Sequence, residues 1–258
     1  MIQSRDNQRY KHLLRIVQAK RPLGGGQSQL WLEGVHLCQS WLACFGHPDG
    51  VVIDADKADT NEEINGLLEQ ISSLKPDILS SNLFRSLSSV QQPQGIAFVV
   101  TAPERLVSGP LVSKALLLDR VQDPGNLGTL LRTAAAADID QVYLSAGCAA
   151  AWSQKVLRSA QGAHFSLTIF EHVELSTLIA EAQVPIFATS LSDAQSLYDT
   201  VIPDQSAWLF GNEGQGVATQ LLQQADKRVF IPQSDRVESL NVAIAAGICL
   251  FEQRRQNL

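Results

Sequence analysis

Short apolar runs separated by helix-like stretches recur along the second part of the chain. They lie at residues 96–100, 115–119, 141–145, 165–170, 185–189, 207–211 and 228–231. Because the strands of a parallel sheet are buried on both faces and joined by helices, this alternation predicts an α/β fold with a parallel sheet covered on both sides. Ligands of such sheets bind beyond the carboxyl ends of the strands, so the chemistry should lie in the loops there.

The residues before these runs follow another pattern. They predict, in chain order, a basic helix around 13–17, a stop at Pro22 and the glycines at 24–26, a helix over 30–43, a strand over 51–53 and a helix over 61–73. The polar run SLSSVQQPQ at 86–94 has the composition of a linker. We therefore expect a small α/β domain at 1–92 and a larger domain at 95–258.

Composition excludes several classes of protein. The 258 residues are 45% hydrophobic and 18% charged, which suits a globular chain with a substantial core. No stretch approaches the roughly 18 apolar residues of a membrane span, and the N-terminus lacks the apolar region of a signal peptide. We therefore expect a cytoplasmic protein with no membrane partner. The four cysteines lack C-x-x-C spacing, which indicates neither a disulfide framework nor a metal site.

Charge is distributed unevenly along the chain. The net charge is −6, which alone does not indicate a nucleic-acid partner. Residues 1–30, however, carry six basic residues against the single acid Asp6, a local net charge of +5, so the remainder carries −11. Such a basic arm is expected to contact RNA phosphates, although a simply solvated helix would look the same. The arm residues expected to bind RNA are Arg5, Arg9, Lys11 and Arg15.

The first segment with chemical potential follows the run at 115–119. Asp123, Pro124 and Gly125 predict a turn, and Asn126 is a candidate N-cap for the helix that follows. Arg132 then lies about a turn and a half into that helix, from where it could point toward the strand ends. The alternative is that Arg132 is only a solvated helix residue.

The second segment is a glycine-rich loop after the run at 207–211. Gly211, Gly214 and Gly216 allow close backbone approach to a ligand. Glu213, in the same loop, is the carboxylate of the chain most strongly indicated as a functional residue. The last two glycines resemble part of a dinucleotide fingerprint, but Thr219 stands where its third glycine would be. A nicotinamide-dependent reductase is therefore the weaker alternative, and no triphosphate-binding loop is present.

The third segment begins with Ile231 and Pro232 and continues through a polar loop into the last helix. Ser239 is the candidate N-cap of that helix. The amide of Asn241 must find hydrogen-bond partners if it is buried. Small residues at 243–247 permit close packing, either within the fold or against a second chain.

Together, these segments resemble the three motifs of the SpoU (TrmH) class of SPOUT RNA methyltransferases. The matching runs are Asn126-x-Gly128-x-x-x-Arg132, Phe210-Gly211-Asn212-Glu213-Gly214-x-Gly216, and Ile231-Pro232 followed by Glu238-Ser239-Leu240-Asn241-Val242-Ala243. The resemblance covers about residues 95–258. The stretch WLEGVHL at 31–37 is similar to the small substrate-binding domain often fused ahead of that class. Several relatives carry a hydroxyl residue where this chain has Glu238 or Ala243, which weakens any assignment of the hydroxyl that orients the substrate.

The resemblance implies a SPOUT-type parallel sheet with a C-terminal trefoil knot, preceded by a small α/β (L30e-like) domain that binds the RNA. It also implies a homodimer that completes the active site, S-adenosyl-L-methionine as cofactor and no metal. General rules of chain topology would have argued against a knot. The implied cofactor-binding residues are Leu209, Gly211, Gly216, Ile231 and Leu240, and the implied catalytic residues are Asn126, Arg132, Glu213, Ser239 and Asn241.

The implied reaction is methyl transfer to a ribose 2′-hydroxyl. A guanidinium has a pKa above about 12 and no acceptor atom, so we expect Arg132 to stay charged, grip a phosphate and stabilise the alkoxide. Glu213 or a water would then accept the proton. The separate N-terminal domain favours ribosomal RNA over transfer RNA as the substrate. A catalytically degenerate RNA-binding protein is the remaining alternative, and the intact polar set argues against it.

Overall fold

The computed structural model describes residues 1–18, 29–58, 61–103 and 105–258. The turn expected at Pro22 and 24–26 lies outside these residues. Contacts divide the chain into two compact units, Met1–Glu104 with Trp152–Leu157, and Arg105–Ala151 with Arg158–Leu258. Within the described ranges, no helix is both long enough and apolar enough to cross a membrane. Each unit is described separately below.

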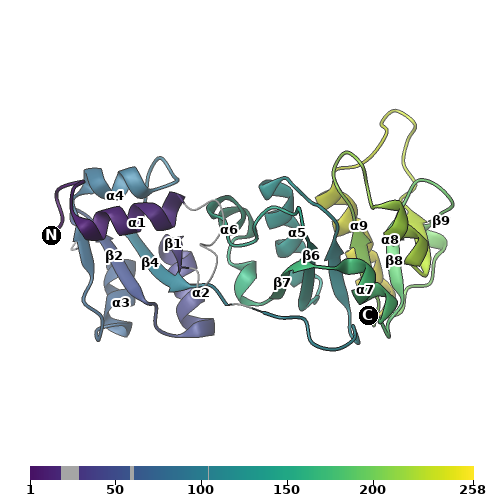
Figure 1. The fold of residues 1–258 in the computed structure, drawn as a ribbon, viewed down its shortest axis with the longest axis horizontal. Helices are drawn as coiled ribbons and strands as arrows, with labels where there is room; N and C mark the ends of the chain where they lie inside the picture. The colour runs from purple at the N-terminus through teal and green to yellow at the C-terminus, as the bar shows by residue number, and fades with distance from the viewer. Residues whose placement is uncertain (19–28, 59–60, 104) are drawn as a thin grey trace. The chain divides into compact units, whose positions relative to one another are not determined.

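The first unit is a four-stranded sheet with helices on both faces (Figure 1). In spatial order its strands are β1 (Gln29–Glu33), β4 (Ile96–Thr101), β2 (Gly50–Asp54) and β3 (Asp77–Leu79). Its helices are α1 (Gln8–Gln18), α2 (Val35–Phe45), α3 (Glu62–Gln70) and α4 (Ser81–Leu87). Helices α1 and α4 pack on one face over a core that includes Leu13, Trp31 and Phe84. Helices α2 and α3 cover the other face.

Two sequence predictions for this unit were wrong. The expected helix over 30–43 begins as a strand, in which Trp31 pairs with Val99 of β4. Gly34 lies between this strand and α2. Its φ of 101° is a backbone conformation that favours glycine, and the chain changes there from strand to helix. The run at 96–100, expected to open the catalytic domain, is β4 and pairs with β1 and β2. The boundary expected at 92–95 therefore precedes the last strand of the first sheet.

The second unit is a seven-stranded sheet in which every neighbouring pair is parallel. In spatial order its strands are β7 (Thr168–Val173), β6 (Gln141–Ser145), β5 (Ala115–Leu118), β10 (Ala207–Phe210), β8 (Ile186–Thr189), β11 (Lys227–Phe230) and β9 (Gln195–Ser196). The strand expected over 165–170 starts later, because residues 163–165 form a short 3-10 helix. The remaining strand predictions are correct to within a residue or two.

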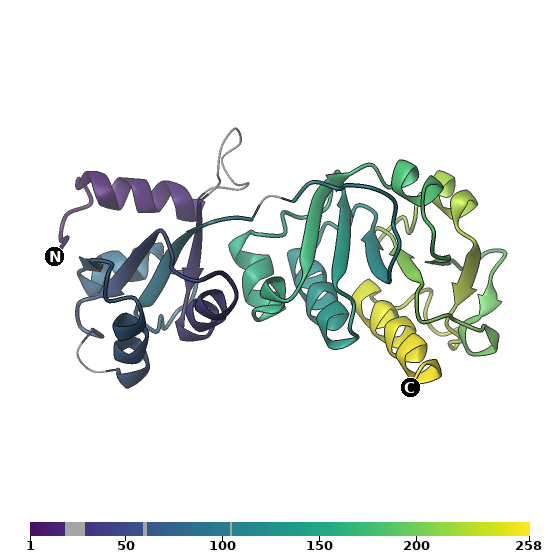
Figure 2. The ribbon, with the colours of Figure 1, turned by 90° about the horizontal axis from the view of Figure 1, so that it is seen from below.

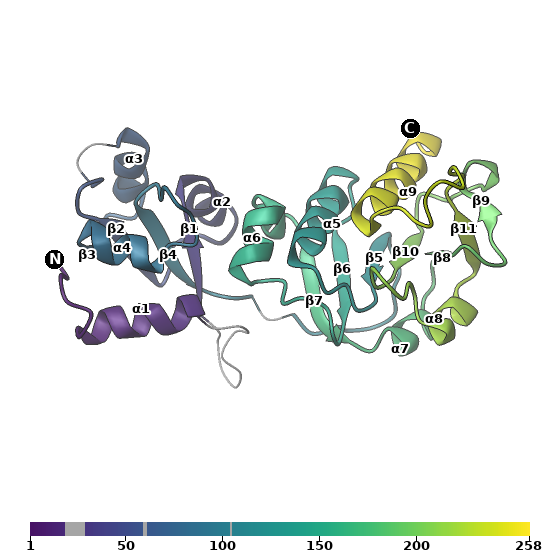
Figure 3. The same cartoon turned by 90° about the horizontal axis from the view of Figure 1, so that it is seen from above.

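Helices cover both faces of this sheet (Figures 2 and 3). The α-helices of the second half of the chain are α5 (Pro124–Ala136), α6 (Gln154–Ala160), α7 (Leu175–Ala180), α8 (Thr219–Gln224) and α9 (Val242–Gln256), with 3-10 turns at Ala163–Phe165 and Leu197–Asp199. Helices α5 and α9 lie side by side on one face, and α7 and α8 lie together on the other. The predicted α/β fold with a covered parallel sheet is confirmed.

Helix caps fix where α5 and α9 begin. Asp123 caps α5 by accepting a hydrogen bond from the backbone N–H of Asn126 at 2.8 Å. Asn126 therefore lies inside the first turn, and its prediction as the cap was wrong. Asn241 caps α9 by accepting from the N–H groups of Ala243 and Ile244, so the cap expected at Ser239 was wrong as well. The amide side chains of Asn126, in the first turn of α5, and Asn241, at the cap of α9, lie close enough to share a hydrogen bond.

Candidate active site

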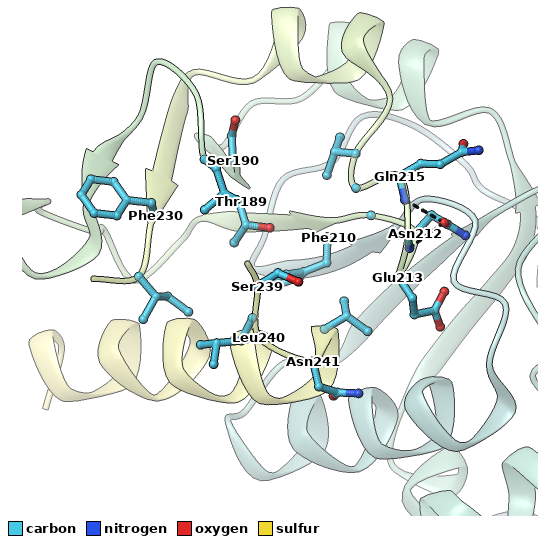
Figure 4. Close-up of a pocket in the computed structure, with 18 of the residues that line it drawn as sticks. Thr189, Ser190, Phe210, Asn212, Glu213, Gln215, Phe230, Ser239, Leu240 and Asn241 are labelled. Atoms are coloured by element: carbon cyan, nitrogen blue, oxygen red, sulfur yellow. Dashed lines mark hydrogen bonds between the residues drawn. The ribbon is translucent and has the colours of Figure 1, made fainter. Parts of the chain in front are cut away.

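A cavity of about 580 Å³ lies at the carboxyl ends of β8, β10 and β11 (Figure 4). The loop 211–216 and the first turn of α9 line it together with Thr189 and Ser190 at the end of β8. Strand β10 lies between β5 and β8 although it follows both in sequence. The chain continues from β5 to β6 on one side of the sheet and from β10 to β11 on the other, so the connections after β5 and β10 diverge. Such crevices are the usual ligand sites of parallel sheets, and the volume suits a nucleoside-sized ligand.

The glycine-rich loop is folded back on itself. The backbone groups of Asn212 and Gly216 exchange two hydrogen bonds, of 3.0 and 2.8 Å. The side-chain oxygen of Asn212 accepts from the N–H groups of Gly214 and Gln215. A Cβ atom placed on Gly211 would lie 2.1 Å from the backbone of Gly216, so the loop closes this tightly only with glycine at 211.

Three side chains from the three predicted segments meet beside the cavity. Asn126 donates from Nδ2 to Glu213 Oε1 at 3.1 Å, and Asn241 donates from Nδ2 to Asn126 Oδ1 at 2.8 Å. A carboxylate can only accept, so Glu213 fixes the orientation of the Asn126 amide, which in turn fixes that of Asn241. The Asn241 oxygen is thereby directed at the N–H groups of α9. Three of the five predicted catalytic residues, Asn126, Glu213 and Asn241, thus form one connected network.

The Glu213 carboxylate is held by three donors. In addition to Asn126, it accepts from the backbone N–H groups of Asp123 at 3.0 Å and Gln122 at 3.2 Å. Partial burial acts to raise the pKa of Glu213, but the hydrogen bonds from Asn126, Asp123 and Gln122 outweigh it, so the pKa lies below its ordinary value. A carboxylate with a lowered pKa is a poor proton acceptor. With three donors already bound, the carboxylate is better placed to hold neighbouring groups than to take up a proton.

An ion pair at the end of β5 supports the same loop, and sequence reasoning did not find it. Arg120 donates from Nε and Nη2 to the two carboxylate oxygens of the buried Asp119, at 3.0 and 3.1 Å. Its Nη1 donates to Gln215, and its carbonyl accepts from Asn212 Nδ2. Arg120 also has a φ of 55°, which is uncommon for a residue other than glycine. Residues held in such conformations often serve a site.

The predicted cofactor residues divide into two groups. Gly211, Gly216, Ile231 and Leu240 line the cavity. Leu209 does not, because it is fully buried in the core between the sheet and helices α7 and α8. The end of β8 was not predicted to contribute, although Thr189 and Ser190 line the cavity. Their place directly after a buried strand was the signal that could have found them.

The predicted catalytic residues also differ in position. Asn126, Glu213, Ser239 and Asn241 line the cavity, and Figure 4 shows Glu213 and Asn241 at the side next to α5. Arg132 is exposed on α5 and is absent from the cavity wall. Its expected catalytic role stays a prediction.

The basic residues of the N-terminal arm are not equivalent. Arg9 forms an ion pair with Asp77 at 2.6 Å, and Lys11 forms one with Asp6 at 3.3 Å. Arg5 and Arg15 are exposed. Two of the four predicted RNA-binding cations are therefore paired with neighbouring carboxylates.

The fold and the site define a class. A covered parallel sheet, a nucleoside-sized cavity at its carboxyl edge and a polar network at the cavity rim are features of an α/β enzyme with a bound nucleoside cofactor.

Comparison with known proteins specifies the family. Residues 113–251 match the SpoU rRNA Methylase family. The chain is 34% identical over 226 residues to the 23S rRNA (guanosine(2553)-2′-O)-methyltransferase RlmP of Bacillus subtilis, which covers 86% of this chain and 87% of that protein. The chain belongs to the SpoU rRNA methylase family, as its three motifs predicted.

Solved structures agree with this assignment. An RNA 2′-O ribose methyltransferase superimposes with a TM-score of 0.82 at 26% identity, covering 99% of this chain and 98% of that one. An AdoMet-bound rRNA methyltransferase from Sinorhizobium meliloti gives a TM-score of 0.84 at 24% identity, covering 100% of this chain and 98% of that one, which shows the same fold. The likeness in each case extends over both units of the chain.

Proposed function

We propose that this protein transfers a methyl group from S-adenosylmethionine to a ribose 2′-hydroxyl of ribosomal RNA. The observation that carries the proposal is the hydrogen-bonded network of Asn126, Glu213 and Asn241 at the rim of a nucleoside-sized cavity. RlmP, whose name states this reaction on 23S rRNA, aligns over most of both proteins.

The cavity residues fit the cofactor. Gly211 removes side-chain bulk where the loop and cavity meet, and Gly216, Ile231 and Leu240 add backbone and apolar surface. Bound there, S-adenosylmethionine supplies a methyl group activated by a sulfonium. The chain's own task is to hold the ribose hydroxyl in line with that methyl group and to exclude competing nucleophiles. The family's C-terminal trefoil knot, formed around this cavity, is part of the proposal.

The polar network is proposed to receive the ribose. Glu213 is held by its three donors, so its role is to fix the amides of Asn126 and Asn241 while those amides and Ser239 contact the RNA. The proton of the hydroxyl passes to water. Glu213 is therefore proposed to position the two amides and not to accept the proton, and its lowered pKa suits this role.

We propose that Arg132 acts in the active site of a second copy of the chain. It is exposed on α5, beside α9, where Ile244 and Phe251 are exposed apolar residues that a homodimer would bury. From a partner subunit, the charged guanidinium would grip a phosphate of the substrate and stabilise the developing alkoxide.

Ribosomal RNA is preferred to transfer RNA as the substrate. The alignment with RlmP includes 86% of this chain, so it extends well beyond the methylase region at 113–251 into the N-terminal unit. That unit is proposed to be the RNA-binding domain, with an L30e-like fold. A cytoplasmic location follows if the enzyme acts where bacterial ribosomes are assembled.

Methyl transfer in vitro tests the proposal. The purified protein is incubated with unmethylated transcribed 23S rRNA and S-adenosylmethionine labelled in its methyl group, and the RNA is hydrolysed with alkali. A 2′-O-methyl group blocks cleavage at its own nucleotide, so we expect label in alkali-resistant dinucleotides. Label in mononucleotides would indicate base methylation and contradict the ribose assignment. Absence of label, with no cofactor binding at millimolar concentration by calorimetry, would favour a degenerate RNA-binding protein.

A further inference from the structure

We propose that helices α1 and α4 together form the surface on which the N-terminal unit docks the phosphate backbone of RNA. The inference rests on the proposed function, which makes RNA the substrate. It goes further by assigning one face of the unit, by adding Arg85 and by removing two of the cations expected from the sequence.

Charge is sorted between the two faces of this unit. The Lys and Arg residues of α1 and α4 are Arg9, Lys11, Arg15 and Arg85, and neither helix carries an acid. The opposite pair has the reverse composition: α3 carries Glu62, Glu63 and Glu69, and neither α2 nor α3 carries Lys or Arg. By the charges of the helices, a polyanion favours α1 and α4 over α2 and α3. Among the described residues, the carboxylates that contact α1 and α4 are those of Asp6 and Asp77, each paired with a cation of α1, and of Asp54 and Asp56, both bonded to Ser81.

Helices α1 and α4 form one continuous surface. The hydroxyl groups of Tyr10 on α1 and Ser86 on α4 lie 2.7 Å apart in a hydrogen bond. Leu13 and Phe84 pack into the same core beneath them. Figure 1 shows the two helices next to each other on one side of the sheet. Arg85 precedes Ser86 directly on α4 and is exposed.

The cations on this face differ in availability. Arg9 and Lys11 are paired with Asp77 and Asp6. Arg15 and Arg85 are exposed, and across the described ranges neither forms an ion pair with a carboxylate. We therefore assign the phosphate contacts to Arg15 and Arg85. Exposed amides on the same two helices, at Gln8, Gln18 and Asn82, provide further donors for phosphate oxygens.

The test is a double charge reversal with a charge-matched control. Arg15→Glu with Arg85→Glu changes the proposed face, whereas Lys57→Glu with Lys75→Glu makes the same change in net charge at exposed positions outside α1 and α4. The probe is unmethylated transcribed 23S rRNA, and its affinity is measured between 50 and 200 mM salt. Thermal melting and S-adenosylmethionine affinity are measured for every variant.

The first variant should lose about tenfold or more in RNA affinity at 0.1 M salt, with a salt slope lowered by about one to two. The control should stay within about twofold of wild type, and all variants should bind S-adenosylmethionine equally. Wild-type RNA affinity and slope in the first variant would overturn the proposal, as would an equal loss in the control. A wild-type protein that binds neither RNA nor cofactor would instead contradict the proposed function itself.

Discussion

Glu213 shows at the scale of one residue how a charge orders its surroundings. Its carboxylate accepts from Asn126 and from two backbone N–H groups, and so sets the direction of two amides. Because its pKa is lowered, the charged form and the stabilisation it brings are complete above about pH 4.5, the ordinary value, and are lost only as the pH falls through the lowered value. The network should therefore be intact throughout the pH range of an ordinary assay.

Glu213→Gln should lower kcat by about tenfold to a hundredfold, because the amides lose the charge that orients them. The shape of the kcat against pH profile between pH 5.5 and 8 should stay the same, since Glu213 does not titrate there. Stopped assays at saturating cofactor would measure this. An inflection present in the wild-type profile and missing in the variant would identify Glu213 as the proton acceptor after all.

Arg120→Gly removes the guanidinium of Arg120 while the backbone keeps its conformation. Glycine suits the φ of 55°, which relieves roughly 1 kcal/mol of strain, while the contacts to Asp119 and Gln215 are lost. We expect the melting temperature to fall, because the buried Asp119 carboxylate loses its partner, and S-adenosylmethionine affinity to fall about fivefold, because the loop loses its contact through Gln215.

Asp138→Gly is the matched control for that variant. Asp138 also has positive φ, at 60°, and also forms an ion pair, with Arg254, but it is absent from the cavity wall. Its substitution should leave cofactor affinity unchanged. Equal affinities of wild type and Arg120→Gly in calorimetry would remove the positioning role of Arg120.

At the scale of elements, the loop 211–216 depends on one glycine more than on the others. Gly211→Ala places a Cβ atom 2.1 Å from backbone atoms, whereas at Gly214 the nearest atom is 3.6 Å away, an ordinary contact. We expect Gly211→Ala to weaken S-adenosylmethionine binding by at least about tenfold, or about 1.4 kcal/mol, and Gly214→Ala to have little effect. Calorimetric titrations of both variants that gave the same affinity would contradict this reading of the loop.

Sequence predicted the elements unevenly, and the reasons are physical. Asn126, Glu213 and Asn241 were found because each lies in one of the three motifs that resemble the family, in a segment that follows a strand of the parallel sheet. Strand β1 was taken for helix because a short apolar run has no decisive periodicity. The Asp119 and Arg120 clamp was missed because it requires positive φ at Arg120, which an arginine in a sequence does not indicate.

At the scale of the whole molecule, the assignment of β4 needed the structure. Its residues are buried on both sides and suit either sheet, so only pairing with β1 and β2 decides its place. The position of Arg132 raises a similar issue, because a residue outside its own chain's cavity can still serve a site in a dimer. Neither relation is local in sequence.

Mixed dimers test that role of Arg132. In a co-expressed pair of differently tagged chains, Arg132→Ala keeps the cofactor site and Gly211→Ala keeps the arginine. At a cofactor concentration well below the Kd of Gly211→Ala, each should have little activity alone, and random mixing should restore about one quarter of wild-type activity, since half the dimers carry one complete site. In the control, Arg132→Ala is co-expressed with a chain that carries both Arg132→Ala and Gly211→Ala. This mixture should stay inactive, because neither chain supplies the arginine. An active Arg132→Ala homodimer, or no recovery in the mixture, would contradict the composite site.

Ribose methylation mapped across total ribosomal RNA tests the proposed reaction most directly. RNA is compared from cells with the gene, cells without it and cells that carry only the Asn126→Ala variant. We predict one 2′-O-methylated nucleotide that is present with the wild-type gene and absent in the other two. An identical ribose methylation map in all three would contradict methyl transfer to ribosomal RNA by this protein.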